Sequence, residues 1–306
     1  MATSRSVSFI SLFLVLMFSP GLCRAQVPVE PSSYAVTMIS PAYFGPFAFP
    51  VPDILGGEVS DKLRVEAGVD DAIGTIGGKD AKDFTVAPTF KVNFPLWTPR
   101  ANLSIWGEMH EFYNDSPEAR AARRVSPEYP LKDNDSGSIY ISTDLLILTE
   151  TGRRPSVALR AALLTATGDD YEKARHYDAP GYFFDISAGK TFALGTAGNI
   201  RVSGAFGFVC WQIDRGRQND AWMLAAKMSY SLGLLTFSAE YGRYCGWGRL
   251  DNARKPEAGD CPKVLKCRLD LHFGRFSPFV AAQYGLQDYP FTRLRAGLSV
   301  DFPILK

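Results

Sequence analysis

Residues 291–302 read Phe-Thr-Arg-Leu-Arg-Ala-Gly-Leu-Ser-Val-Asp-Phe, a stretch in which apolar and polar residues alternate. From Leu294 to Phe302 every second residue is apolar, and the residues between them are charged, serine or glycine. A period of two is typical of a β-strand with one apolar and one polar face. Because a soluble antiparallel sheet can show the same pattern, its recurrence and spacing must decide between a soluble sheet and a membrane barrel.

The alternation recurs from residue 59 to the end of the chain and predicts twelve strands. Long polar connections take turns with short ones: residues 71–82, 114–136, 167–180, 213–219 and 245–262 are long, and 96–99, 151–155, 193–197, 231–233 and 274–277 are short. Outer-membrane barrels have this asymmetry between extracellular loops and periplasmic turns, and an even strand number. Aromatic residues at strand ends, Trp211 among them, fit the interfacial girdles of such barrels.

These patterns together predict an all-β fold. We expect a transmembrane antiparallel up-and-down β-barrel of about twelve strands over residues 59–306, with short periplasmic turns and longer extracellular loops. Strands of roughly 10 to 12 residues favour it over a soluble sandwich, whose strands are usually shorter.

The first 25 residues have the pattern of a cleaved secretion signal. Arg5 precedes an apolar run over residues 7–18, and Cys23-Arg24-Ala25 follows it. The run is shorter than the ~20 apolar residues that span a membrane. We therefore expect residues 1–25 to direct export and to be removed after Ala25.

Residues 26–58 form a Pro/aromatic-rich N-terminal segment. Proline lacks the N–H that a β-ladder needs, so an extended, irregular path is expected here. Two interpretations stay open: the segment packs in the barrel lumen or against its periplasmic mouth, or it is a disordered lead-in to the first strand.

Three stretches carry a resemblance to a known group of proteins. They are residues 94–103 (Phe-Pro-Leu-Trp-Thr-Pro-Arg-Ala-Asn-Leu), 40–46 (Ser-Pro-Ala-Tyr-Phe-Gly-Pro) and 273–278 (Phe-Gly-Arg-Phe-Ser-Pro). They resemble uncharacterised porin-like outer-membrane β-barrel proteins of the Bacteroidetes type. The resemblance implies a barrel in the outer membrane of a Gram-negative cell, and it implies no substrate and no functional residues.

Strand parity predicts which charged side chains face the lumen. The set consists of Arg64, Glu66, Lys91, Glu108, His110, Asp144, Arg160, Asp185, Arg201, Lys227, Glu240, Lys266, Arg268, Asp270, Arg293, Arg295 and Asp301. They indicate either a polar pore whose charges tune selectivity or a narrow barrel filled by ion pairs. Their mixed signs argue against strong anion or cation selectivity.

An outer-membrane lipid hydrolase is the weaker alternative. The chain has 3 histidines, and none is placed by the pattern beside a serine in a triad. Glu108 and His110 could form an acid/base pair, although a luminal hydrogen bond is the simpler interpretation. We predict no catalytic residues, no metal site and no cofactor.

Two features of the predicted loops are testable. Ser116 and Pro117 have the pattern of a helix cap and first helical residue, so a short helix is expected behind them. Cys245 and Cys261 bracket one outside loop of an exported chain and could form a disulfide.

The sequence therefore predicts a porin-like channel for passive passage of small solutes or ions across the cell outer membrane. The alternative is a non-conducting structural or receptor-like barrel with a side-chain-filled lumen. Without residues 1–25 the 33 basic residues fall to 31, because Arg5 and Arg24 are lost, against 32 acidic ones, which gives no support to nucleic-acid binding. The expected partners are outer-membrane lipid and small solutes or ions, with a homo-oligomer left open.

Overall fold

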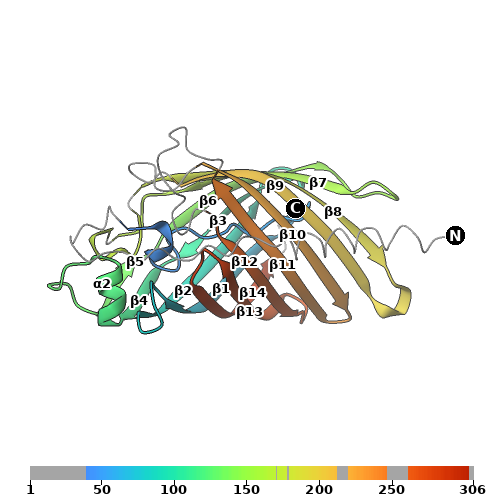
Figure 1. The fold of residues 1–306 in the computed structure, drawn as a ribbon. Helices are drawn as coiled ribbons and strands as arrows, with labels where there is room; N and C mark the ends of the chain where they lie inside the picture. The colour runs from blue at the N-terminus through green and yellow to red at the C-terminus, as the bar shows by residue number, and fades with distance from the viewer. Residues whose placement is uncertain (1–38, 170, 178, 212–219, 247–260, 303–306) are drawn as a thin grey trace.

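The computed structural model of the protein describes residues 39–169, 171–177, 179–211, 220–246 and 261–302. The predicted signal peptide, residues 1–25, and the following residues 26–38 lie outside this described part. The described chain forms one antiparallel sheet that closes on itself, because β1 pairs with β14 on one side and with β2 on the other (Figure 1).

The sheet contains 14 strand segments. They are β1 (Leu63–Thr75), β2 (Lys82–Pro95), β3 (Ala101–Glu108), β4 (His110–Asp115), β5 (Lys132–Ser136), β6 (Ile139–Leu148), β7 (Ser156–Leu164), β8 (Gly181–Ala193), β9 (Asn199–Trp211), β10 (Ala221–Leu232), β11 (Leu235–Gly246), β12 (Lys263–Leu271), β13 (Phe276–Gln287) and β14 (Phe291–Phe302). Segments β3 and β4 both pair with β2, so together they form one interrupted strand. In the same way β6 pairs with β3 and β5 pairs with β4, so β5 and β6 form a second interrupted strand. The barrel therefore has the predicted 12 strands.

The strands point their apolar residues outward and their polar residues inward. In β14, Leu294 is 55% exposed, whereas its neighbour Arg293 is 7% exposed. Large apolar side chains such as Phe206 and Leu224 are exposed on the outside of other strands. An apolar exterior around a polar lumen is the arrangement of transmembrane barrels and confirms the predicted fold class.

A β-bulge separates β3 from β4. While β2 advances three positions, from Val86 to Thr89, its partner advances four, from Phe112 back to Glu108. The extra residue reverses the inside–outside parity beyond it. The prediction that His110 faces the lumen is therefore wrong: its ring lies 5.0 Å from that of Phe112, which is 52% exposed on the outer face.

The barrel rises further at its long-loop end than the sequence predicts. Strand β1 continues to Thr75, so the predicted loop 71–82 shrinks to residues 76–81. The helix α2 (Pro117–Ala122) lies at this end with β4 and β5 (Figure 1). Its N-cap is the predicted one, because the Ser116 hydroxyl accepts from the Ala119 N–H at 3.1 Å. The described chain contains no helix long and apolar enough to cross a membrane.

Residues 39–58, named the plug segment below, lie inside the barrel. The segment starts with the 3-10 turn η2 (Pro41–Tyr43) at the same end as α2 (Figure 1). Its aromatic and aliphatic side chains pack with inward-facing residues of the wall, including Tyr140, Phe183, Trp211, Met223, Tyr244 and Phe291. This buried cluster, the outer core, fills the lumen toward the long loops.

Candidate functional site

The lumen contains a polar cavity of about 870 Å³, named the inner cavity below. Side chains of the strands line it, together with residues 50–55 and 57–62 of the chain. Residues 39–49 belong to the outer core and are not part of its lining. The inner cavity therefore lies between the outer core and the short turns.

The structure brings most of the predicted lumen residues to this cavity. Those that line it are Arg64, Glu66, Lys91, Glu108, Asp144, Arg160, Arg201, Lys227, Glu240, Lys266, Arg268, Asp270, Arg293 and Arg295. The others lie elsewhere: Asp185 is buried 4.0 Å from Arg160, Asp301 binds Arg64 at 2.6 Å, and His110 is on the outer face.

Ion pairs connect residues of β12, β14 and β1 along one side of the cavity. Arg268 on β12 binds Glu66 on β1 at 2.9 Å and Asp270 at 2.8 Å. Arg293 and Arg295 on β14 both bind Asp70 on β1, at 2.5 and 2.7 Å. The pairs between the adjacent strands β14 and β1 stabilise the sheet in addition to lining the lumen, whereas Arg268 and Glu66 lie on strands that β13 and β14 separate.

Asp70 is a lumen residue that the sequence analysis missed. The predicted first loop starts at residue 71, and the predicted charged lumen residues of the first strand are Arg64 and Glu66. In the structure Asp70 lies opposite Arg295 in the β1–β14 register and is 1% exposed. Two nearby arginines in β14 with too few acidic partners could have pointed to it.

Aromatic rings close the cavity toward the outer core. Trp106 stacks on Tyr140 with centroids 5.3 Å apart, and Phe183 and Trp211 pack against them edge to face. All four rings line the cavity. The interpretation of Trp211 as a membrane-interface residue is wrong, because its side chain points inward and is 2% exposed.

Small residues on the inner face of β8, β9 and β10 make room for the plug segment. Ile54 packs against Ala205 and Ala225 of β9 and β10. Gly189 on β8 lies so close to the segment that a Cβ built there would be 2.2 Å from the Gly56 carbonyl oxygen. The wall and the segment are thus complementary in shape, and a larger inward side chain here would displace the segment.

Polar contacts hold the C-terminal end of the plug segment, near Gly56 and Gly57, which is called its lower end; the end near Tyr43 is its upper end. Arg201 donates to the Gly56 carbonyl at 2.8 Å, and the Gly57 N–H donates to the Ser187 hydroxyl at 3.0 Å. Arg201 also binds Glu150, in the turn after β6, at 2.8 Å. Partial burial alone would raise the pKa of Glu150, but the Thr191 N–H, Lys190 and Arg201 lower it to about 2.

Arg123 holds the upper end of the segment. Its Nε donates to the Tyr43 carbonyl at 2.7 Å, and its guanidinium pairs with Asp83 and Asp115, both at 2.5 Å. The Arg123 side chain is fully buried. The Gly45 N–H donates to the Ala174 carbonyl at 2.9 Å, so the loop before β8 also contacts the segment.

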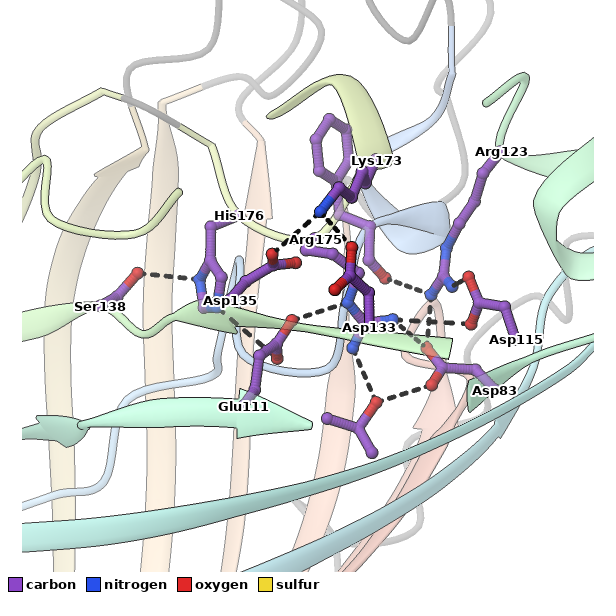
Figure 2. Close-up of polar contacts among 12 residues, drawn as sticks. Asp83, Glu111, Asp115, Arg123, Asp133, Asp135, Ser138, Lys173, Arg175 and His176 are labelled. Atoms are coloured by element: carbon purple, nitrogen blue, oxygen red, sulfur yellow. Dashed lines mark hydrogen bonds and ion pairs between the residues drawn. The ribbon is translucent and has the colours of Figure 1, made fainter. Parts of the chain in front are cut away.

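Arg175 extends this network, as Figure 2 shows. It binds Glu111 at 2.6 Å and Asp83 at 2.9 Å and donates to the Thr85 hydroxyl at 2.7 Å. Burial alone would lower the pKa of Arg175, but Asp83, Glu111 and Asp115 raise it well above its ordinary value. The guanidinium therefore stays charged, and the loop that carries it is fixed above the plug segment.

Ser138, His176 and Glu111 lie in the order of a catalytic triad (Figure 2). The Ser138 hydroxyl is 3.0 Å from His176 Nδ1, and Glu111 Oε2 is 3.5 Å from His176 Nε2. The pattern of the sequence did not indicate this contact, because Ser138, between β5 and β6, and His176, in the loop before β8, are 38 residues apart. All three side chains are at most 4% exposed and none lines the inner cavity. A nucleophile must be accessible to its substrate, and these side chains are not. We therefore assign them a structural role at the long-loop end of the barrel.

Cys245 at the end of β11 and Cys261 before β12 are joined by a disulfide. Cys210 and Cys267 are free thiols. Among the residues that the structure describes, no group of His, Cys, Asp and Glu side chains could hold a metal ion.

Comparisons with known proteins identify the fold. No family model matches the chain, and no curated protein matches its sequence. The COG4313 outer membrane channel from Pseudomonas putida F1 is similar in structure, with a TM-score of 0.54 and 12% identity, over 83% of this chain and 100% of that chain.

Two further solved structures are similar over much of the chain. The KdgM porin in complex with disordered oligogalacturonate has a TM-score of 0.47 and 9% identity, over 78% of this chain and 99% of that one. LpxR from Salmonella typhimurium has a TM-score of 0.45 and 9% identity, over 78% and 100%. The likeness to the COG4313 channel shows that the chain shares the barrel fold of an outer-membrane channel.

Proposed function

We propose that the protein is a porin-like channel of a Gram-negative outer membrane and that the plug segment gates it. Small solutes or ions would pass passively through the lumen. The observation that carries this proposal is the inner cavity of about 870 Å³, which is lined by charged groups of both signs. A polar, charged lumen inside an apolar exterior is what a water-filled membrane passage requires.

Other observations support the location. The exposed apolar side chains of the barrel provide a surface for outer-membrane lipid. The predicted signal peptide, residues 1–25, would direct export, and the shared fold of the COG4313 channel agrees with an outer-membrane setting. The origin in Bacteroidetes and the homo-oligomer stay predictions from the sequence.

The outer core favours a second candidate, a non-conducting structural or receptor-like barrel. Tyr43, Phe44 and Phe47 of the plug segment are at most 3% exposed, so the described lumen is filled toward the long loops. A channel therefore needs at least partial displacement of the segment. Conductance with the segment free and with it tethered distinguishes the two candidates.

The test uses residues 26–306, refolded and inserted in a planar lipid bilayer. A Cβ built at Gly242 would lie 3.0 Å from Val51 Cγ1, so cysteines at the two positions are within reach of a disulfide. We compare the wild type, Val51→Cys alone and the double variant Val51→Cys/Gly242→Cys, each oxidised and then reduced. The first two are controls for the native disulfide.

We expect discrete conductance steps from the wild type and from Val51→Cys in both states. The double variant should be silent when oxidised and should conduct after reduction. A silent wild type with a heat-modifiable band on gels, which shows a folded barrel, would contradict the channel and support the second candidate. Steps that persist in the oxidised double variant would contradict gating by the plug segment.

A further inference from the structure

Asp53 places a carboxylate of the plug segment among cations of the lumen. Lys266 forms an ion pair with this carboxylate and donates to the Val51 carbonyl at 2.8 Å. Arg160 donates to the Asp53 carbonyl at 2.7 Å. The Asp53 side chain is nevertheless 67% exposed. A solute in the inner cavity can therefore reach the carboxylate, while the Lys266 side chain that binds it is 13% exposed.

Two further cations act on the same position. The positive charges of Lys91 and Arg295 add to that of Lys266 at Asp53. Lys91 has no carboxylate within ion-pair distance among the described residues, and its ammonium group lies 5.8 Å from the centre of the Trp106 ring. Glu66, which lies opposite Lys91 in the β1–β2 register, is bound by Arg268 at 2.9 Å, and a cation in a confined lumen attracts anionic solutes.

The other carboxylates near Lys266 compensate its positive charge only in part. Glu240 lies 3.6 Å from Lys266 but also 3.7 Å from Lys227, so one carboxylate is shared between two ammonium groups. Arg160 and Arg295 are bound to Asp144 and Asp70. Without Asp53, the negative charge beside Lys266 and Lys91 would be that of Glu240 and Glu66, each of which also binds a second cation.

We propose that Lys266 and Lys91, with Arg160 beside them, form a carboxylate-binding site in the lumen, and that Asp53 occupies it as a tethered ligand. A small solute that carries a carboxylate takes the place of Asp53. This inference rests on the proposed channel function and names the class of solute that the channel would accept. Charge-assisted hydrogen bonds from an ammonium group to a carboxylate are strong enough to select it over neutral solutes.

The tethered carboxylate should weaken the binding of any free one. If Asp53 occupies the cations nine-tenths of the time, the site is free for a solute about one-tenth of the time, and the apparent affinity falls about tenfold. Removing the charge of Asp53 should therefore increase the affinity. A purely structural ion pair predicts the opposite: its loss would loosen the segment and create no binding site.

The experiment is calorimetric titration of the detergent-solubilised chain, residues 26–306, with sodium succinate at constant ionic strength. Succinamide, which has the same skeleton without charge, is the control probe. We compare the wild type, Asp53→Asn and the double variant Asp53→Asn/Lys266→Gln. A heat-modifiable gel band verifies that each barrel is folded.

We expect Asp53→Asn to bind succinate about tenfold more tightly than the wild type does, and the double variant to lose this gain. None of the three should bind succinamide. Equal succinate affinity of the wild type and Asp53→Asn would overturn the proposal, and so would a gain that survives in the double variant.

A further variant keeps the test decisive if Asp53→Asn fails to fold. Lys266→Gln alone should lower the succinate affinity of the wild type, and an unchanged affinity in a folded Lys266→Gln barrel would refute the site. Binding in detergent does not depend on conduction. A silent bilayer would therefore contradict the channel alone, whereas absent succinate binding would contradict the carboxylate site alone.

Discussion

Replacement of Arg123 by methionine should release the upper end of the plug segment. The guanidinium of Arg123 is fully buried, donates to the Tyr43 carbonyl at 2.7 Å and pairs with Asp83 and Asp115 at 2.5 Å. Methionine keeps much of the volume but leaves Asp115 buried with a weak partner, because Arg175 is 3.6 Å away.

Asp83 on β2 and Asp115 on β4 belong to the wall, so the loss of their ion pairs does not itself favour displacement of the segment. The segment loses the hydrogen bond to the Tyr43 carbonyl, and a hydrogen bond from a charged group typically contributes about 1.5–3 kcal/mol. At about 1.4 kcal/mol per factor of ten, the closed position of the segment would become roughly ten- to a hundredfold less favoured. Arg120→Met is the matched control. Arg120 lies on α2, whose C-cap residue is Arg123, and among the described residues its side chain donates to the Pro127 and Tyr129 carbonyls at 3.3 and 3.1 Å.

Two measurements check the prediction. Limited proteolysis of folded barrels should cleave within residues 39–58 much faster in Arg123→Met than in the wild type or in Arg120→Met. In planar bilayers the same variant should be open for a larger fraction of the time. Equal cleavage rates for both variants would refute the argument that Arg123 anchors the segment.

Two more predictions concern the lower end of the segment. Gly189→Val should displace residues 56–58 and lower the free energy of unfolding by about 2 kcal/mol, because two hydrogen bonds are lost at roughly 1 kcal/mol each. Gly204→Ala is the control: its Cβ would approach only the Ala225 carbonyl, at 3.5 Å, so the free energy of unfolding should change little. Urea denaturation of both variants measures the difference. The Glu150 carboxylate has a pKa lowered from 4.5 to about 2, so its contribution to stability is complete above pH 4.5 and is lost as the pH falls toward 2. Glu150→Gln should remove this part of the acid sensitivity. Identical pH profiles of the urea midpoint for the wild type and Glu150→Gln would contradict the prediction.

Strand parity predicts the barrel wall because each side chain there faces either lipid or lumen. Leu294 and Arg293 follow this rule, and so do most of the charged residues that line the inner cavity. The rule fails at His110, since a single inserted residue between β3 and β4 reverses the parity.

The contents of the lumen could not be predicted in the same way. The contacts of Arg123 with Tyr43 and of Lys266 with Asp53 join residues 80 and 213 positions apart. No periodicity connects such partners, because the plug segment has no regular secondary structure beyond η2. The prolines and aromatics of the segment indicate packing, but they do not indicate which wall residues receive it.

The position of the plug segment in the chain has a consequence for how the barrel is assembled. The segment immediately precedes β1, and the pairing of β1 with β14, between Leu63 and Phe302 at one end, closes the wall. Protein chains very rarely thread through a closed ring of structure. In the simplest order of assembly, residues 39–58 first bind the inner face of a sheet that is still open. The sheet then closes around them, so the segment is a template for the final pairing of β1 with β14.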